Sequence, residues 1–105
     1  MVINKNKEGS KLVLTLEGRL DTTTAPQLEK IVRTELSDIK ELKMNFETLE
    51  YVSSAGLRVI LSAQKMMNKQ GEMQICNVND MVMEVFDVTG FTDVLNIEQK
   101  DEELK

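Results

Sequence analysis

The sequence predicts an α/β fold: a mixed, mostly parallel β-sheet with helices packed on it, in the order β-β-α-β-α-β-α-β. Short strand-like apolar segments alternate with segments of helical periodicity, which favours parallel strands joined by right-handed crossovers. A turn without a helix joins the first two strands, which adds one antiparallel strand. The length of 105 residues suits one domain over 1–105, with a core at about 2–97 and a charged tail at 98–105.

The first two strands are expected at residues 2–7 and 11–17. Gly9 lies between them and can adopt the positive φ that a tight turn favours. Both faces of the second segment are apolar or β-branched, which predicts a strand buried on both sides. Gly18-Arg19-Leu20-Asp21 is expected to lead out of this strand as a loop.

The segment after this loop has the features of a helix start. Thr22-Thr23-Thr24 supplies a threonine cap, and Pro26 is well tolerated in a first helical turn. Ser37-Asp38 is expected to end the helix. Its apolar face repeats at helical spacing and consists of Leu28, Ile31, Val32 and Leu36.

The central part predicts a strand at residues 41–46 and a loop at 47–50 that leads into Tyr51-Val52. A second helix is expected from about Ser54 to Lys69, with Gly71 as its C-terminal stop. Its apolar face consists of Leu57, Ile60, Leu61 and Met67, widened by Val59, Ala63 and Met66.

The C-terminal part predicts a strand at residues 73–78, a third helix and a short last strand at 94–97. Asn79 or Asp80 can cap the helix, and Gly90 is expected to end it. Four of its side chains are expected to face inward: Met81, Val82, Val85 and Phe86.

Composition excludes several classes of function. The chain has no histidine and one cysteine, Cys76, so it cannot build a serine–histidine hydrolase site or a typical zinc site. The net charge of −5 and the 4% of aromatic residues argue against nucleic-acid binding. No apolar run approaches membrane-spanning length and no signal pattern is present, which predicts a cytoplasmic protein without membrane contact. We expect no cofactor and no metal.

The most informative segment is Tyr51-Val52-Ser53-Ser54-Ala55-Gly56-Leu57-Arg58. It places two hydroxyls and a glycine at the start of an amphipathic helix, directly after a strand. A helix N-terminus presents unpaired backbone N–H groups and the positive end of the helix dipole, so it tolerates negative charge. A serine there is either a neutral N-cap or the carrier of a regulatory phosphate.

These features together resemble the STAS domain, and more narrowly the stand-alone anti-sigma factor antagonists of bacteria. The resemblance rests on the element order, on Gly18-Arg19-Leu20-Asp21 and above all on Val52-Ser53-Ser54-Ala55-Gly56-Leu57. Asn45 and Gly71-Glu72 also fit the family pattern. The resemblance covers Val2 to about Ile97.

The resemblance implies a binding protein rather than an enzyme. In that family the domain binds an anti-sigma factor that is also a serine kinase, which releases the sigma factor. Phosphorylation of one serine breaks the complex, and a serine phosphatase restores the free antagonist. The partner surface then comprises Asp21, Ser53, Ser54, Ala55, Gly56, Leu57 and Arg58. A monomer is the simplest expectation.

The family motif often reads Asp-Ser-Ser/Thr-Gly-Leu, with the phosphorylated serine after the aspartate. Aligned on Gly56-Leu57, Ser54 is the phospho-acceptor, Ser53 takes the aspartate's place and Ala55 replaces the second hydroxyl. Because the preceding carboxylate is missing, Ser53 is a rival acceptor, or the N-cap beside a modified Ser54. Asp21 matches a family acidic position near the acceptor, and its alternative role is that of a turn residue.

Other interpretations stay open. An unphosphorylated STAS scaffold or regulatory subunit of a signalling or transport complex would share the fold. A small enzyme with Ser54 as nucleophile would need a lysine or an aspartate in place of histidine. Nucleotide binding has no supporting motif in this chain. Arg58, Lys65 and Lys69 either contact a partner or form a solvated helix face.

Overall fold

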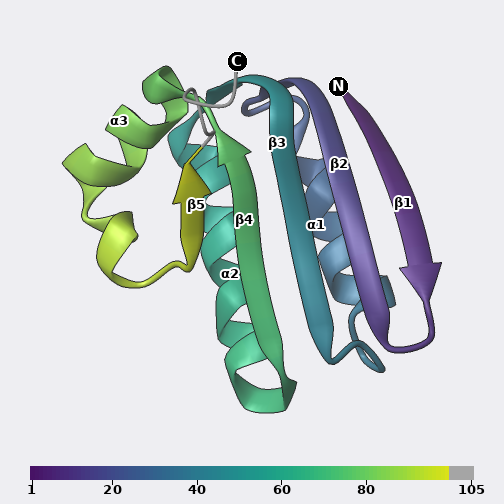
Figure 1. Ribbon diagram of the computed structural model, residues 1–105. Coiled ribbons are helices and arrows are strands. Elements are labelled where there is room, and N and C mark those ends of the chain that lie inside the picture. The colour runs from purple at the N-terminus through teal and green to yellow at the C-terminus, as the bar shows by residue number, and fades with distance from the viewer. Residues whose placement is uncertain (100–105) are drawn as a thin grey trace, which may run out of the picture.

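A five-stranded sheet in the order β1-β2-β3-β4-β5 forms the centre of the computed structural model, which describes residues 1–99 (Figure 1). β1 pairs antiparallel with β2, and the remaining neighbours pair in parallel, as the sequence predicts. The strands are β1 (Val2–Glu8), β2 (Lys11–Leu20), β3 (Glu41–Val52), β4 (Glu72–Val78) and β5 (Ile97–Gln99).

The helices connect successive parallel strands. They are α1 (Ala25–Glu35), α2 (Ser54–Gln70) and α3 (Asp80–Thr89), followed by the short 3₁₀ helix η1 (Phe91–Asp93). Every parallel step moves in the same direction across the sheet, so right-handed crossovers bring the connections to the same side. Figure 1 shows α1 and α2 behind the sheet and α3 beside its β4–β5 end. None of these helices combines the length and apolarity needed to cross a membrane.

The core lies between the sheet and this helical layer. Alternate side chains of β2 and β3 are almost completely buried there: Leu12, Leu14, Leu16, Leu42, Met44 and Phe46. On the opposite face of β2, Val13 and Thr15 are only half-buried. The prediction of a strand buried on both sides is therefore wrong, because the helices that follow β2 and β3 cover one face.

The two long strands continue where the sequence suggested loops. Residues 47–50 belong to β3, and Gly18 to Leu20 belong to β2, with Leu20 opposite Val52. The pairing of β2 with β3 shifts register at two places, between Thr15 and Glu17 and between Gly18 and Arg19. The side chain of Asn45 accepts a hydrogen bond from the Glu47 N–H at 3.0 Å, which supports one of these bulges. The prediction of a loop at residues 47–50 is therefore wrong, because these polar residues belong to a paired strand.

Most helix ends follow the predictions, but α1 ends at Glu35, with Leu36 as its C-cap, before the predicted Ser37-Asp38. Asn79 caps α3 by accepting from the Val82 N–H at 2.8 Å, and Gly90 ends α3 with φ of 78°. Gly71 ends α2, where its lack of a side chain matters because a β-carbon would overlap the Lys40 carbonyl. At α1, Thr24 occupies the cap position, but its hydroxyl donates to the Arg19 carbonyl at 2.7 Å instead of capping the helix.

The C-terminal part differs most from the expectations. Met81 is 63% exposed, whereas an inward position was predicted, and the buried face of α3 is formed by Val82 and Phe86. The last strand is Ile97–Gln99 instead of 94–97, because residues 91–93 form a 3₁₀ turn. Of the predicted tail, residues 98 and 99 thus belong to this strand, and residues 100–105 lie outside the described residues.

Candidate functional site

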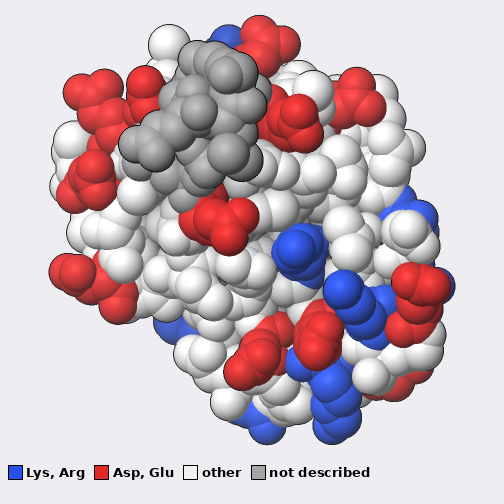
Figure 2. Space-filling model, viewed as in Figure 1, with Lys and Arg blue, Asp and Glu red and all other residues white. Residues whose placement is uncertain are grey.

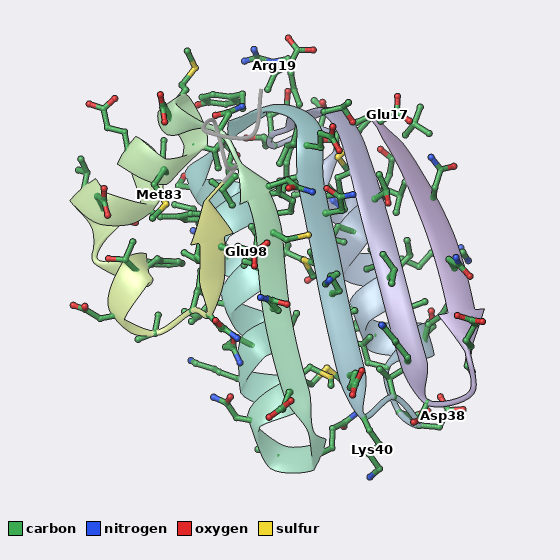
Figure 3. The ribbon with its side chains drawn as sticks, in the orientation of Figure 1. Glu17, Arg19, Asp38, Lys40, Met83 and Glu98 are labelled. Atoms are coloured by element: carbon green, nitrogen blue, oxygen red, sulfur yellow. The ribbon has the colours of Figure 1, made fainter. Side chains whose placement is uncertain are left out.

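The two segments singled out in the sequence meet at one edge of the sheet. Leu20 and Val52 are opposite each other in the parallel pair β2–β3, so the residues that follow them emerge side by side. The Ser53 N–H donates to the Leu20 carbonyl at 2.8 Å and ties the two loops together. Figure 3 shows Arg19 at this carboxyl-terminal edge, with Asp38 and Lys40 at the opposite edge.

Ser53 is the N-cap of α2. Its backbone is extended, with φ of −92° and ψ of 174°, and its Oγ accepts from the Gly56 N–H at 3.3 Å. Its carbonyl accepts from the Leu57 N–H at 2.9 Å and so begins the helix. The half-buried hydroxyl of Ser53 is therefore engaged in the cap.

Ser54 has a different environment, although it is the next residue. It is the first residue of α2 and is exposed, and its hydroxyl forms no hydrogen bond within residues 1–99. The first-turn N–H groups and the helix dipole favour negative charge at this position. Of the two candidate acceptors, Ser54 thus presents an accessible hydroxyl at a site that can accommodate a phosphate.

Gly56 and Leu57 pack beneath the start of α2 and fix its position against the sheet. A β-carbon on residue 56 would lie 2.6 Å from Leu20 Cγ and 3.0 Å from the Leu20 carbonyl oxygen, so glycine allows α2 to pack closely against the end of β2. Leu57 is only 5% exposed and belongs to the core. Both residues were expected on a partner surface, and in the structure both are buried at the base of the helix start.

Asp21 organises the neighbouring loop. Its Oδ1 accepts from the Thr23 hydroxyl at 2.8 Å, the Thr23 N–H at 3.0 Å and the Thr24 N–H at 3.2 Å. These hydrogen bonds, that of the Thr23 hydroxyl above all, lower the pKa of Asp21 below its usual 3.8. The carboxylate is therefore charged at neutral pH and holds the turn that leads into α1.

Two residues join the site that the sequence reasoning did not select. The Arg19 guanidinium lies over the Tyr51 ring at 4.5 Å, and its Nε is 3.8 Å from Asp21 Oδ2. Arg19 and Tyr51 are paired in the register of β2 and β3. That register is set by the two strand irregularities, so no pattern in the sequence could have indicated the pair.

A shallow groove runs beside Ser54 between α1 and α2. Its volume is about 230 Å³. Thr22, Ala25, Pro26 and Glu29 line one side, and Ala55, Arg58, Val59 and Ser62 line the other. Arg58 is exposed on the rim, and Lys65 and Lys69 are exposed further along α2. The groove offers both apolar surface and charge next to the serine.

Comparison with known proteins identifies the class. Residues 2–104 match the family model of the STAS domain, so the chain belongs to the STAS domain family. This confirms the resemblance seen in the sequence.

Individual relatives narrow the comparison. The "Putative anti-sigma factor antagonist BtrV" of Bordetella bronchiseptica is 30% identical over 92% of this chain and 85% of its own length. The anti-sigma-B factor antagonist of Staphylococcus aureus is 29% identical, over 81% of each chain. The fold is that of the anti-sigma factor antagonist SpoIIAA in its unphosphorylated form, with a TM-score of 0.74, 19% identity, and coverage of 98% of this chain and 93% of SpoIIAA.

Proposed function

We propose that this protein is an anti-sigma factor antagonist that binds an anti-sigma factor with serine kinase activity while Ser54 is unmodified. Phosphorylation of Ser54 breaks the complex, and a serine phosphatase regenerates the binding form. The exposed hydroxyl of Ser54, beside a Ser53 that is already used as the helix cap, carries this proposal. The names of the relatives support it, and so does the existence of SpoIIAA in a phosphorylated form.

The binding surface is formed by the loop that contains Asp21, the start of α2 and the groove between α1 and α2. Ser54, Ala55 and Arg58 present side chains to a partner, whereas Gly56 and Leu57 hold the helix start in place. The protein acts as a monomer in the bacterial cytoplasm and performs no catalysis of its own. The kinase and phosphatase activities both belong to its partners.

The switch is electrostatic. A phosphoserine carries about −1.5 to −2 charges at neutral pH. Within this chain the N-terminus of α2 offsets part of that charge, so the fold is retained. A partner packed over Ser54 would have to desolvate the dianion, which costs several kcal/mol and lowers the affinity by orders of magnitude.

Arg58 strengthens the switch. It lies four residues after Ser54 on the same exposed face of α2, which is the spacing at which helical side chains meet. A phosphate on Ser54 would pair with the Arg58 guanidinium. Phosphorylation of Ser54 therefore adds negative charge to the surface, and the Arg58 guanidinium, paired with the phosphate, is no longer available to the partner.

Phosphorylation by a candidate anti-sigma factor kinase from the same organism tests the proposal. The protein, its Ser54→Ala variant and its Ser53→Ala variant are incubated with this kinase and ATP, and the phosphopeptides are mapped by mass spectrometry. We expect one phosphate on Ser54 in the wild type and in Ser53→Ala, and none in Ser54→Ala. A tight complex without any phosphate transfer would contradict the proposal and favour a scaffold.

A further inference from the structure

The outer face of α3 exposes apolar side chains that no element of residues 1–99 covers. Met81 is 63% exposed and Val88 is 80% exposed, and Val85 between them is half-buried. Their spacing of four and three residues places them on one side of the helix. With Glu84 and Thr89 they line a shallow hollow of about 300 Å³. We call this surface the α3 strip.

The α3 strip is separate from the Ser54 site. No residue of the strip belongs to the groove between α1 and α2 or to the loop of Asp21. The buried side of α3 already contributes to the core through Val82 and Phe86, with the Phe86 ring 6.4 Å from that of Phe46. The exposed apolar residues are therefore not needed to hold the helix in place.

The chain segment that contains the strip carries charge of one sign. Residues 70–99 contain no lysine or arginine, and their acidic residues are Glu72, Asp80, Glu84, Asp87, Asp93 and Glu98. Residues 1–69 instead contain eleven basic and nine acidic residues. Figure 2 shows acidic side chains gathered on the side where α3 lies, and basic ones mainly below and to the right over the strands. Glu84 is itself part of the hollow.

Exposed apolar side chains beside acidic residues favour one kind of binding partner over the others. A second copy of the chain would bring the same acidic surroundings, and an anionic membrane would be repelled. Apolar contact within a negatively charged rim fits a partner that surrounds its apolar side chains with cations.

We propose that the α3 strip is a second docking surface of this protein, for an amphipathic helical segment of a partner protein whose apolar residues are flanked by lysine or arginine. Met81 and Val88 pack against the apolar face of that helix, and Glu84 faces its basic rim. Binding is weakened by salt, because exposed charges at the rim are screened. The surface works whether or not Ser54 is phosphorylated.

Synthetic peptides and nuclear magnetic resonance test this proposal on the full chain. The probe is a helical leucine–lysine peptide of about four turns, compared with a leucine–glutamate peptide and a serine–lysine peptide of equal length. We expect amide shifts confined to α3 and its immediate surroundings with the first peptide only. Shifts spread over other acidic surfaces, or equal binding of the serine–lysine peptide, would overturn the proposal.

A double variant, Met81→Ser with Val88→Ser, provides the matched comparison. Because both side chains are already exposed, the fold is retained, which circular dichroism checks. We expect the affinity for the leucine–lysine peptide to fall by about tenfold or more. Val2→Ser, which alters a 54% exposed valine in β1, leaves it unchanged. Equal affinity of all three proteins, or self-association of the wild type that the double variant abolishes, would overturn the proposal.

Discussion

Replacing Gly56 by alanine tests whether the serine motif needs glycine for packing. The added methyl group would lie 2.6 Å from Leu20 Cγ and 2.9 Å from Leu20 Cδ2, whereas ordinary contact begins at 3.4 Å. Leu20 is completely buried, so its side chain cannot move into solvent. The carbonyl oxygen of Leu20, at 3.0 Å, is held by the Ser53 N–H and gives little room either.

The magnitude follows from two opposing effects. Overpacking of a buried site costs about 1–3 kcal/mol. Alanine in place of glycine within a helix stabilises the helix by about 1 kcal/mol. Because the overlap with Leu20 is severe and Leu20 is fully buried, the overpacking cost here lies in the upper part of its range, about 2–3 kcal/mol. The net loss of unfolding free energy is then about 1–2 kcal/mol, and the melting temperature of a domain of this size falls by roughly 4–16 °C.

Urea unfolding followed by circular dichroism measures this loss, and a double-mutant cycle identifies its cause. In a Leu20→Ala background the side-chain overlap is absent, so Gly56→Ala should cost much less than in the wild type. A Gly56→Ala variant as stable as the wild type would refute the packing argument. So would an equal cost in both backgrounds.

Three further predictions concern the caps and the ionised loop. Ser53→Ala loses the bond to the Gly56 N–H and should cost about 1 kcal/mol in urea unfolding, whereas Ser54→Ala should stay within about 0.5 kcal/mol of the wild type; the reverse order would contradict the assignment of the two serines. Asn79→Ala loses both the α3 cap and the bond from Asn79 Nδ2 to the Leu49 carbonyl, and should cost about 1–2 kcal/mol in the same assay; an unchanged midpoint would argue against this cap. Because the folded pKa of Asp21 lies below its usual 3.8, this carboxylate stabilises the fold above that pH, and the effect disappears as the pH falls through the folded value. Asp21→Asn should therefore show a shallower loss of stability than the wild type between about pH 5 and pH 2, and parallel pH profiles would rule this contribution out.

The sheet and most of the element order could be predicted because periodicity and turn residues act locally. The alternation of Leu12, Leu14 and Leu16 indicates a strand, and Gly90 indicates a helix end, whatever lies beyond them. The continuation of β3 through residues 47–50 could not be predicted, because those polar residues are held in the strand by pairing with β2. Long-range pairing of this kind leaves no local pattern.

In the candidate site, too, local features could be predicted and features that depend on long-range contacts could not. The sequence indicated the helix start with Ser53 and Ser54 and the loop of Asp21, because caps and turns are local features. It could not separate the two serines, since the difference lies in which hydroxyl reaches the Gly56 N–H. It also missed the exposure of Met81, because the inner face of α3 is decided by contacts such as that of Phe86 with Phe46.

The affinity of one anti-sigma factor for two forms of this protein tests the central claim most directly. The protein is prepared unmodified and with phosphoserine at position 54, and both dissociation constants are measured by titration calorimetry. The electrostatic switch predicts that phosphorylation weakens binding by about a hundredfold or more, with an unchanged circular dichroism spectrum. Equal affinity of the two forms would contradict it.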